Sequence, residues 1–242
     1  LLLLPLGLEG LALAPMGLGI EGVLAVGAWI SALPGAVLAV PAMPAAGLLA
    51  ISLGGLWLAL WRRSWRFAGL APVALGLALP WFTTQPVLLV DGEAKLVALR
   101  TVQGLAFSSA RAASFTADAW LQRTAQPRRI AMPRAGSGGR DGIACDALGC
   151  IGGVGAFKIA IIRDAQALPE DCTSADIVVA LVPVRRRCPS ARLVVDRFDL
   201  WRNGAHALYL EAGTIRLDSV GRDRGIRPWA PDPAARRNRE AQ

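Results

Sequence analysis

The chain has 242 residues, of which 54% are hydrophobic, and its net charge is +8. Only two of its 26 basic residues are lysines, and His206 is its one histidine. A single histidine excludes the histidine-rich metal sites of many hydrolases, and it leaves a two-metal nuclease without the ligands that it needs.

The charge is distributed unevenly along the chain. Before Arg62 the only charged residues are Glu9 and Glu21, and nearly all the remaining charge lies in residues 83–242. This difference in composition predicts an apolar part, residues 1–82, that is compatible with lipid. The charged part is long enough for one globular domain.

The first residues of the chain are strongly apolar. Residues 1–14 begin with four leucines and contain neither a methionine nor a basic segment. A signal peptide is an alternative, since Ala12–Ala14 has the small residues of a cleavage site, but the basic n-region is missing and Pro15 would follow the cut. We therefore expect residues 1–14 to be the truncated end of a membrane helix that belongs to a longer protein.

A further helix is predicted over Gly19–Leu33, and Pro34, Pro41 and Pro44 interrupt the chain after it. An apolar stretch interrupted by prolines is typical of a re-entrant or interfacial segment buried among other helices, because irregular backbone is not tolerated in contact with lipid. A membrane span remains the alternative for residues 15–44.

Two uncharged apolar runs, Ala45–Trp61 and Phe67–Phe82, flank the segment Arg62–Arg66. A charge near the bilayer centre costs about 2.5–3.5 kcal/mol, so charge-free runs of this length predict membrane helices. Tryptophans lie near the ends of the runs, as in an interfacial aromatic belt: Trp57, Trp61, Trp65 and Trp81. Buried helices of a soluble core are the alternative.

Three arginines, Arg62, Arg63 and Arg66, occupy the short segment between the two runs. Short basic loops stay in the cytoplasm. The arginines therefore predict a cytoplasmic tip for the hairpin, and the chain after Phe82 is expected on the opposite face of the membrane.

The charged part shows alternating short apolar runs and turns. Hairpins are predicted for Val87–Val90 with Leu96–Leu99 and for Ala205–Leu210 with Thr214–Val220. Single strands are predicted for Phe157–Ile162, Ile177–Val182 and Leu193–Val195, and short helices for Ser114–Arg123 and Arg197–Asn203. Loops or turns are expected at Arg134–Gly142, Pro169–Asp171 and Gly152–Gly155.

These elements predict a membrane α-helical segment, residues 1–82, followed by a soluble α+β or layered α/β domain, residues 83–220. Arginine, proline and aspartate dominate residues 221–242, and we expect a disordered tail there.

Four cysteines lie in the soluble part: Cys145, Cys150, Cys172 and Cys188. An even number in a domain outside the cytoplasm favours disulfides, and the short spacing makes a Cys145–Cys150 bridge feasible, which leaves Cys172 to pair with Cys188. Free buried thiols and a four-thiolate zinc site are the alternatives, although the Cys172–Cys188 spacing is too long for a zinc knuckle.

Catalytic residues are hard to find. His206 lies in an apolar strand pattern, where a structural role is expected, and Asp176, Asp196 and Asp199 lie near strand ends, where capping is common. The glycine-rich segments match neither a phosphate-binding nor a dinucleotide fingerprint. We therefore predict no enzymatic activity, no cofactor and no metal.

The arginines suggest a nucleic-acid partner. Arg185, Arg186 and Arg187 form the densest basic cluster outside the tail, with Arg192 and Arg197 close in sequence. Arginine pairs bidentately with phosphate, so these residues are candidate DNA-phosphate contacts. A solvated basic loop that reflects only the arginine-rich composition of the chain is the alternative.

Several segments resemble one family over essentially the whole chain. They are GIEGVLAVGAWI (19–30), PAMP (41–44), LGGLWLALWRRSWR (53–66), QPVLLVDGEAKLVALR (85–100), CDALGC (145–150), DCTSADIVV (171–179) and VDRFDLWRNGAHA (195–207). In these segments the chain resembles the end of the membrane channel and the C-terminal domain of the ComEC family of DNA-internalisation proteins, in its alphaproteobacterial form.

The resemblance implies a multi-pass inner-membrane channel that passes one DNA strand into the cytoplasm. It also implies a C-terminal periplasmic domain similar to a metallo-β-lactamase, and the rest of the channel as a partner. Many relatives keep a histidine-rich metal motif, which this chain lacks after Leu88–Leu99 and in Ala175–Val184. The domain is therefore expected to be a non-catalytic remnant that is structural or guides single-stranded DNA.

Two other classes of function remain open on the sequence. One is a membrane-anchored periplasmic structural or binding module without a DNA role. The other is a hydrolase with an unrecognised serine or cysteine nucleophile, and its cysteine version requires a free reactive thiol.

Overall fold

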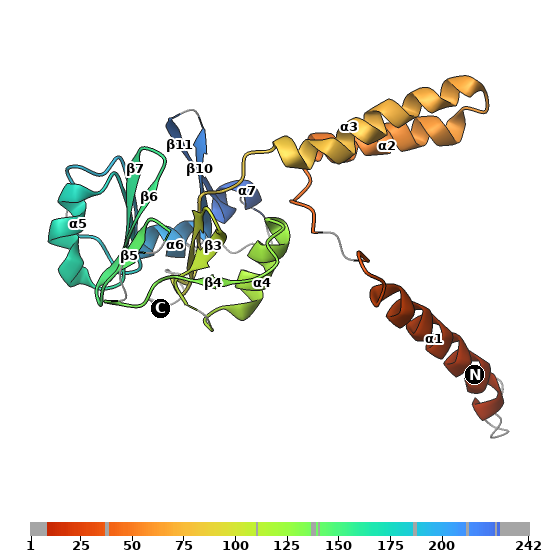
Figure 1. Ribbon diagram of the computed structural model, residues 1–242, viewed down its shortest axis with the longest axis horizontal. Coiled ribbons are helices and arrows are strands. Elements are labelled where there is room, and N and C mark those ends of the chain that lie inside the picture. The colour runs from red at the N-terminus through yellow and green to blue at the C-terminus, as the bar shows by residue number, and fades with distance from the viewer. Residues whose placement is uncertain are drawn as a thin grey trace. The chain divides into compact units, whose positions relative to one another are not determined.

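The computed structural model describes residues 9–36, 39–109, 111–136, 139, 141–185, 188–211, 213–225 and 227 (Figure 1). The chain divides into two units, Leu1–Ala39 and Val40–Gln242.

The described residues of the first unit contain one helix, α1 (Glu9–Ser31). The helix continues through Pro15, so Glu9–Ala14 of the expected segment 1–14 and the helix expected from Gly19 belong to one element. Residues 1–8 lie outside the described part of the chain. Apolar side chains of α1 are exposed over its described length, among them Ile20, Leu24 and Trp29. A helix that is apolar on all sides is typical of a protein interior or a membrane.

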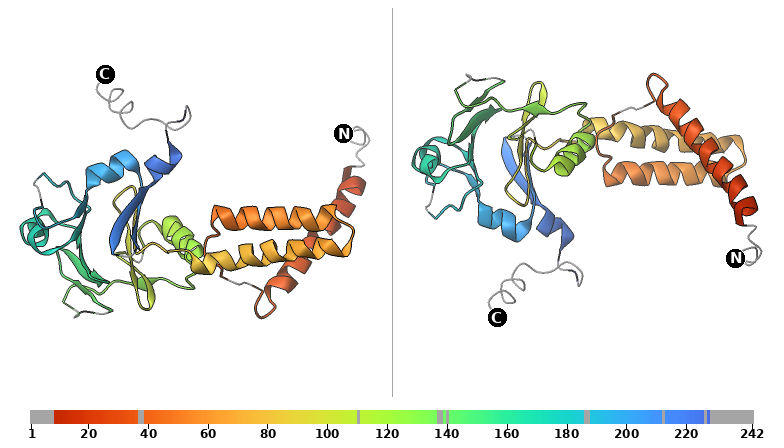
Figure 2. Two further views of the ribbon diagram at one scale, coloured as in Figure 1. Left: turned by 90° about the horizontal axis from the view of Figure 1, so that it is seen from above. Right: turned by 90° about the horizontal axis from the view of Figure 1, so that it is seen from below.

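The second unit begins with a helical hairpin. Helix α2 (Ala45–Leu60) packs against a stretch that combines the 3₁₀ turn η2 (Ser64–Gly69), helix α3 (Leu70–Ala78) and the 3₁₀ turn η3 (Leu79–Phe82). Figure 2 shows the two arms running antiparallel. The predicted pair of helices is confirmed, although the second arm begins at Ser64 and includes Arg66.

A globular domain follows, built on two mixed sheets. The first has the strand order β11-β10-β1-β2-β3-β4, with β1 (Leu88–Val90), β2 (Val97–Thr101), β3 (Gly104–Phe107), β4 (Ile130–Ala131), β10 (His206–Glu211) and β11 (Thr214–Ser219). The second has the order β5-β6-β7-β8-β9, with β5 (Ile143–Cys145), β6 (Gly149–Val154), β7 (Phe157–Ile162), β8 (Ile177–Ala180) and β9 (Leu193–Val195).

The two sheets pack face to face, and a helix covers the outer face of each. Inward-facing residues such as Leu99, Ile161 and Val179 form one buried cluster between the sheets. On the outside, α4 (Ser114–Arg123) packs on the first sheet and α5 (Leu168–Ser174) packs on the second (Figure 1). The domain is therefore a helix–sheet–sheet–helix sandwich, which agrees with the layered α/β expectation.

Strand β7 shows how the sequence produces these layers. Successive strand residues point to opposite faces, so Ile159 and Ile161 join the core between the sheets, whereas Ala160 and Ile162 pack on the side of α5. A strand covered on both faces has a continuous apolar sequence, which is why the strand Phe157–Ile162 could be predicted.

Three expectations about this domain are wrong. Pro169–Asp171, expected as a turn, lies in the first turn of α5. Gly152 and Gly153, expected in a loop, lie in strand β6, and only Gly155 is in the turn after it. Val220, expected at the end of a strand, begins the short helix α7 (Val220–Arg224), so the first residues of the expected tail are helical. Residues 228–242 of that tail lie outside the described part of the chain.

Candidate functional site

The helical hairpin is held together by close backbone contacts at glycines. A Cβ atom on Gly54 would lie 2.6 Å from the Gly69 carbonyl oxygen, and one on Gly76 would lie 2.6 Å from that of Gly47. Small residues at a helix contact let backbones approach closely, which is the usual packing of membrane helices. The four glycines therefore fix the distance between the two arms.

Large apolar side chains cover the outside of the hairpin. Those exposed are Leu48, Leu49, Leu53, Leu56, Leu60, Phe67, Leu70, Leu75 and Leu77. In the part of the chain that the structure describes, one helical stretch, Ser64–Phe82, is long and apolar enough to cross a membrane. Helix α2 and the stretch Pro15–Ser31 of α1 are apolar but shorter.

The tip of the hairpin combines arginines with tryptophans. Arg62, Arg63 and Arg66 are all exposed, and the Arg66 guanidinium lies 5.0 Å from the centre of the Phe67 ring. The Trp57 ring lies 5.6 Å from the Trp65 ring, and its Nε1 donates a hydrogen bond to the Trp65 carbonyl oxygen at 3.3 Å. Tryptophan and arginine at one level are typical of a membrane–water interface.

Two disulfides link the four cysteines. Cys145 pairs with Cys150 across the turn between β5 and β6, and Cys172 of α5 pairs with Cys188 in the loop between β8 and β9. The predicted pairing is confirmed. Because none of the four is a free thiol, the zinc and free-thiol alternatives and a cysteine nucleophile are excluded.

The predicted DNA contacts lie in and after the β8–β9 loop. Arg185 and Arg192 are exposed, whereas Arg186 and Arg187 lie outside the described residues. The Arg192 guanidinium lies 5.5 Å from the centre of the Phe157 ring. The loop is anchored on both sides, because the Val184 N–H donates to Asp196 Oδ2 at 3.2 Å and the Arg192 N–H donates to the Asp176 carbonyl oxygen at 2.7 Å.

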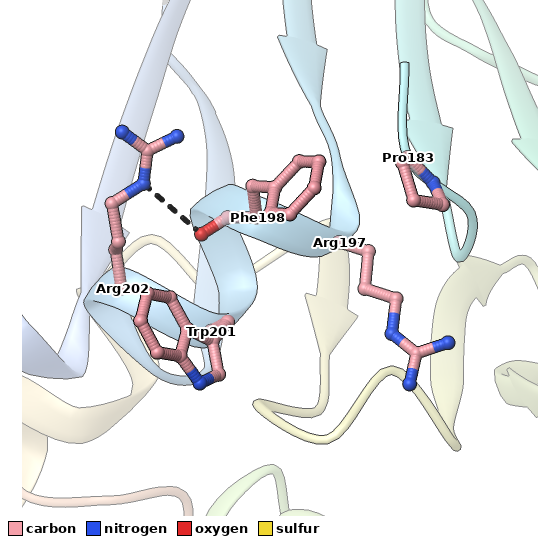
Figure 3. Close-up of a pocket in the computed structure, with 5 residues that line it drawn as sticks. All are labelled: Pro183, Arg197, Phe198, Trp201 and Arg202. Atoms are coloured by element: carbon pink, nitrogen blue, oxygen red, sulfur yellow. Dashed lines mark hydrogen bonds between the residues drawn. The ribbon is translucent and has the colours of Figure 1, made fainter. Parts of the chain in front are cut away.

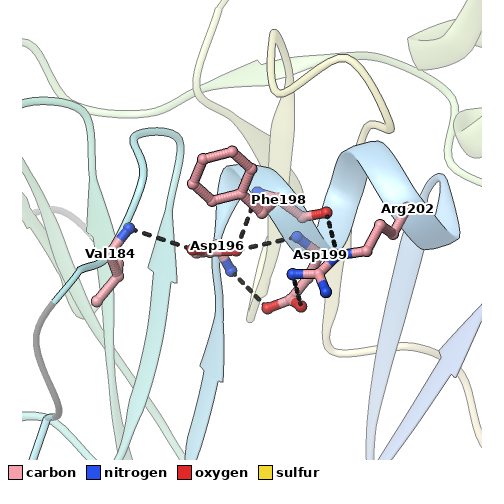
Figure 4. A network of polar contacts seen from close by, with 5 residues as sticks. All are labelled: Val184, Asp196, Phe198, Asp199 and Arg202. Atoms are coloured by element: carbon pink, nitrogen blue, oxygen red, sulfur yellow. Dashed lines mark hydrogen bonds and ion pairs between the residues drawn. The ribbon is translucent and has the colours of Figure 1, made fainter. Parts of the chain in front are cut away.

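Helix α6 (Arg197–Asn203) starts beside this loop with a capping box. Asp196 Oδ1 accepts from the Phe198 and Asp199 N–H groups, each at 2.9 Å, and Asp199 Oδ2 accepts from the Asp196 N–H at 3.2 Å (Figure 4). Asp196 therefore connects the start of α6 to Val184. The expected capping role of Asp196 and Asp199 is confirmed.

A pocket of about 530 Å³ opens on the exposed side of α6. Its lining residues are Pro183, Arg197, Phe198, Trp201 and Arg202 (Figure 3). Arg197 belongs to the basic cluster predicted from the sequence, whereas Phe198, Trp201 and Arg202 were not predicted. The spacing of three between the two aromatic residues within a short helix, between two arginines, was the available signal.

His206 has a structural setting. Its side chain is buried, and Nδ1 lies 2.8 Å from the Gly204 carbonyl oxygen, so Nδ1 carries the proton of the neutral ring. Burial lowers the pKa of His206, while the Gly204 hydrogen bond and the charge of Asp199 act weakly in the opposite direction.

Asp176 also has a structural contact, because its side chain accepts a hydrogen bond from the Lys158 N–H at 2.9 Å. Among the residues that the structure describes, no three histidine, cysteine or acidic side chains are grouped as a metal site would require.

Comparisons with known proteins find no relative: no family model, no curated protein and no solved structure matches the chain. The class is therefore defined by the structure itself. It is a mixed α/β domain with two disulfides, connected to an apolar helical hairpin and carrying an arginine-lined aromatic pocket.

Proposed function

We propose that the chain is the C-terminal part of a ComEC-like inner-membrane channel that takes up single-stranded DNA. Residues 1–82 lie in the bilayer with the rest of the channel, and residues 83–220 form a periplasmic domain. This domain is a non-catalytic relative of the metallo-β-lactamase fold and guides the strand toward the channel.

The hairpin supports the membrane placement. Its arms touch through Gly54 and Gly69 and present leucines outward, an arrangement that leaves a large apolar surface in water but suits lipid. Arginines and tryptophans gather at its tip, as at the cytoplasmic surface of a membrane.

The disulfides support the periplasmic placement of the domain. Such bonds form and persist in oxidising compartments such as the periplasm, and they are rare in the cytosol. The helix–sheet–sheet–helix layering supports the fold assignment, since the resemblance implies a layered domain of this kind. His206, Asp176 and Asp196 are engaged in structural hydrogen bonds, which favours a guiding role over hydrolysis.

The observation that carries the DNA role is the group of exposed arginines around the start of α6. Arg197 and Arg202 line the pocket, and Arg185 follows two residues after Pro183, which lines it too. Neither Arg185 nor Arg197 forms an ion pair within the described part of the chain. Unpaired guanidinium groups are available to phosphates.

The test is the salt dependence of DNA binding. The full chain in lipid nanodiscs should bind a labelled oligothymidylate with an affinity that falls steeply as salt increases, because phosphate neutralisation releases counterions. Replacing Arg185, Arg186 and Arg187 with alanine should lower the slope by about 2, at about 0.7 per phosphate contact on single strands.

A membrane-anchored structural or binding module is the second candidate, favoured by the same hairpin and disulfides. It predicts no salt-dependent affinity for the oligothymidylate and no effect of the triple substitution. Such a result would overturn the DNA role and leave the membrane placement standing.

A further inference from the structure

The α6 pocket has a composition unusual for a surface helix. Phe198 and Trp201 are 46% and 45% exposed, although the neighbouring Leu200 is buried in the core. The helix therefore turns one apolar side chain inward and holds two aromatic rings at the surface. Figure 3 shows the two arginines on either side of these rings.

The charge of the lining favours an anionic ligand. Among the described lining residues, Arg197 and Arg202 are positive and none is negative. The guanidinium group of Arg202 already has partners within the chain. Its Nε donates to the Phe198 carbonyl oxygen at 3.3 Å, and the group lies 3.9 Å from Asp199. Arg197 makes no ion pair with any residue that the structure describes.

Aromatic rings beside guanidinium groups form the usual platform for single-stranded nucleic acid. Successive bases stack on the rings, and arginines contact the backbone phosphates. The pocket volume of about 530 Å³ lies within the range of small-molecule sites, so it has room for an unstacked base. In a duplex the bases are stacked and paired, which makes them unavailable to such a pocket.

We propose that the α6 pocket binds one unstacked base of a single DNA strand, with Phe198 and Trp201 as the stacking surface and Arg197 on an adjacent phosphate. This inference rests on the proposed function and adds the place where the strand is held. Asp196 orients the site, because it caps α6 and holds Val184 beside it.

The test compares two labelled strands of equal length on the full chain in lipid nanodiscs. One is an oligothymidylate, and the other is an abasic strand with the same phosphates but without bases. The oligothymidylate should bind about tenfold more tightly, in keeping with the stacking energy of one base. A double variant, Phe198→Leu with Trp201→Leu, keeps apolar bulk but lacks the rings, and it should bind both strands equally.

Two further variants separate the contributions. Phe115→Ala removes an aromatic residue of α4 that is 86% exposed, and it should keep the preference for the strand with bases. Arg197→Ala should weaken the binding of both strands and lower the salt slope by about 0.7.

Each alternative outcome would reject a different part of the proposal. Equal affinity of the unmodified chain for the two strands would overturn base stacking and leave a phosphate-guiding role. A preference that survives the double leucine substitution would place the stacking surface elsewhere and overturn this site. Binding of neither strand would overturn this inference together with the DNA role.

Discussion

Both carboxylate oxygens of Asp196 are engaged, and they join two segments that frame the α6 pocket. Oδ1 caps the helix, and Oδ2 holds the Val184 N–H of the arginine loop. Asparagine is as good an N-cap as aspartate but has one oxygen, so it can cap α6 or hold Val184, not both.

Asp196→Ala should lower the free energy of unfolding by about 1–2 kcal/mol, because it removes the cap. Asp196→Asn should cost less, since it keeps the cap, yet it should release the loop. Urea unfolding of both variants in detergent measures the difference, and proteolysis near Arg185 reports the loop. An alanine variant as stable as the unmodified chain would show that the capping box contributes little.

His206 provides a pH-dependent contribution to stability. Burial lowers the pKa of its imidazole below the usual 6.5, so between the two values the unfolded chain binds a proton that the folded chain does not. The free energy of unfolding should therefore fall as the pH falls through about 6.5. Buried Asp171 has a raised pKa and the opposite dependence, but its usual value is 3.8, so measurements are kept above about pH 5.5.

His206→Asn keeps a donor near the Gly204 carbonyl oxygen but does not titrate. Urea unfolding at about pH 7.5 and about pH 5.5 should show a loss of stability in the unmodified chain that is smaller in the variant. Equal losses in both would mean that His206 does not titrate differently in the folded and unfolded chain.

At the scale of elements, the hairpin offers a matched pair of adjacent glycines. A Cβ on Gly54 would lie 2.6 Å from the Gly69 carbonyl oxygen, whereas one on Gly55 would meet no atom within 4 Å. Gly54→Ala should separate the arms and lower the melting temperature of the hairpin in detergent. Gly55→Ala should leave it unchanged or raise it, because alanine favours helix by about 1 kcal/mol.

The melting temperature is followed by circular dichroism at a helix wavelength. If the two substitutions have the same effect, the close contact between the arms at Gly54 does not exist in detergent. If only Gly54→Ala destabilises, the glycine contact sets the packing of the arms.

Elements with one strong local signal could be predicted from the sequence, and elements that depend on tertiary contacts could not. Phe157–Ile162 is apolar on both faces, and Ser114–Arg123 has helical spacing, so both were found. Helix α5 was missed because Pro169 and its acidic neighbours are typical of turns. They also suit the first turn of a helix, where proline loses no hydrogen bond and acids meet the positive helix end.

Strand β6 and the aromatic surface of the pocket also depend on tertiary contacts, so they could not be predicted from the sequence. Position 152 of β6 requires a glycine because a Cβ there would be 2.6 Å from Leu99 Cδ2 of the facing sheet, and no local pattern contains this reason. The exposure of Phe198 and Trp201 depends on how Leu200 docks α6 into the core. The sequence therefore indicated Arg197 of the candidate site but neither Arg202 nor the aromatic surface.

At the scale of the whole molecule, the proposal requires the hairpin tip and the domain to lie on opposite sides of the membrane. All four native cysteines are in disulfides, so a single introduced cysteine is the only free thiol. Val102, which is 99% exposed in the turn between β2 and β3, and Ser64 at the hairpin tip are suitable positions.

In intact cells a membrane-impermeant maleimide should label Val102→Cys if the domain lies in the periplasm, as proposed. Ser64→Cys should be labelled only after the cells are permeabilised, since the proposed topology places the arginine tip in the cytoplasm. The reverse pattern, or labelling of both in intact cells, would contradict the proposed topology.

Under the proposed function, the full-length protein passes DNA into the cytoplasm. Natural transformation of the source strain tests it most directly, with the intact gene compared with its deletion and with entry of fluorescent DNA scored in the same cells. If the protein is the uptake channel, the deletion should abolish cytoplasmic entry and transformants while DNA is still held in the periplasm. Normal transformation without the gene would contradict it.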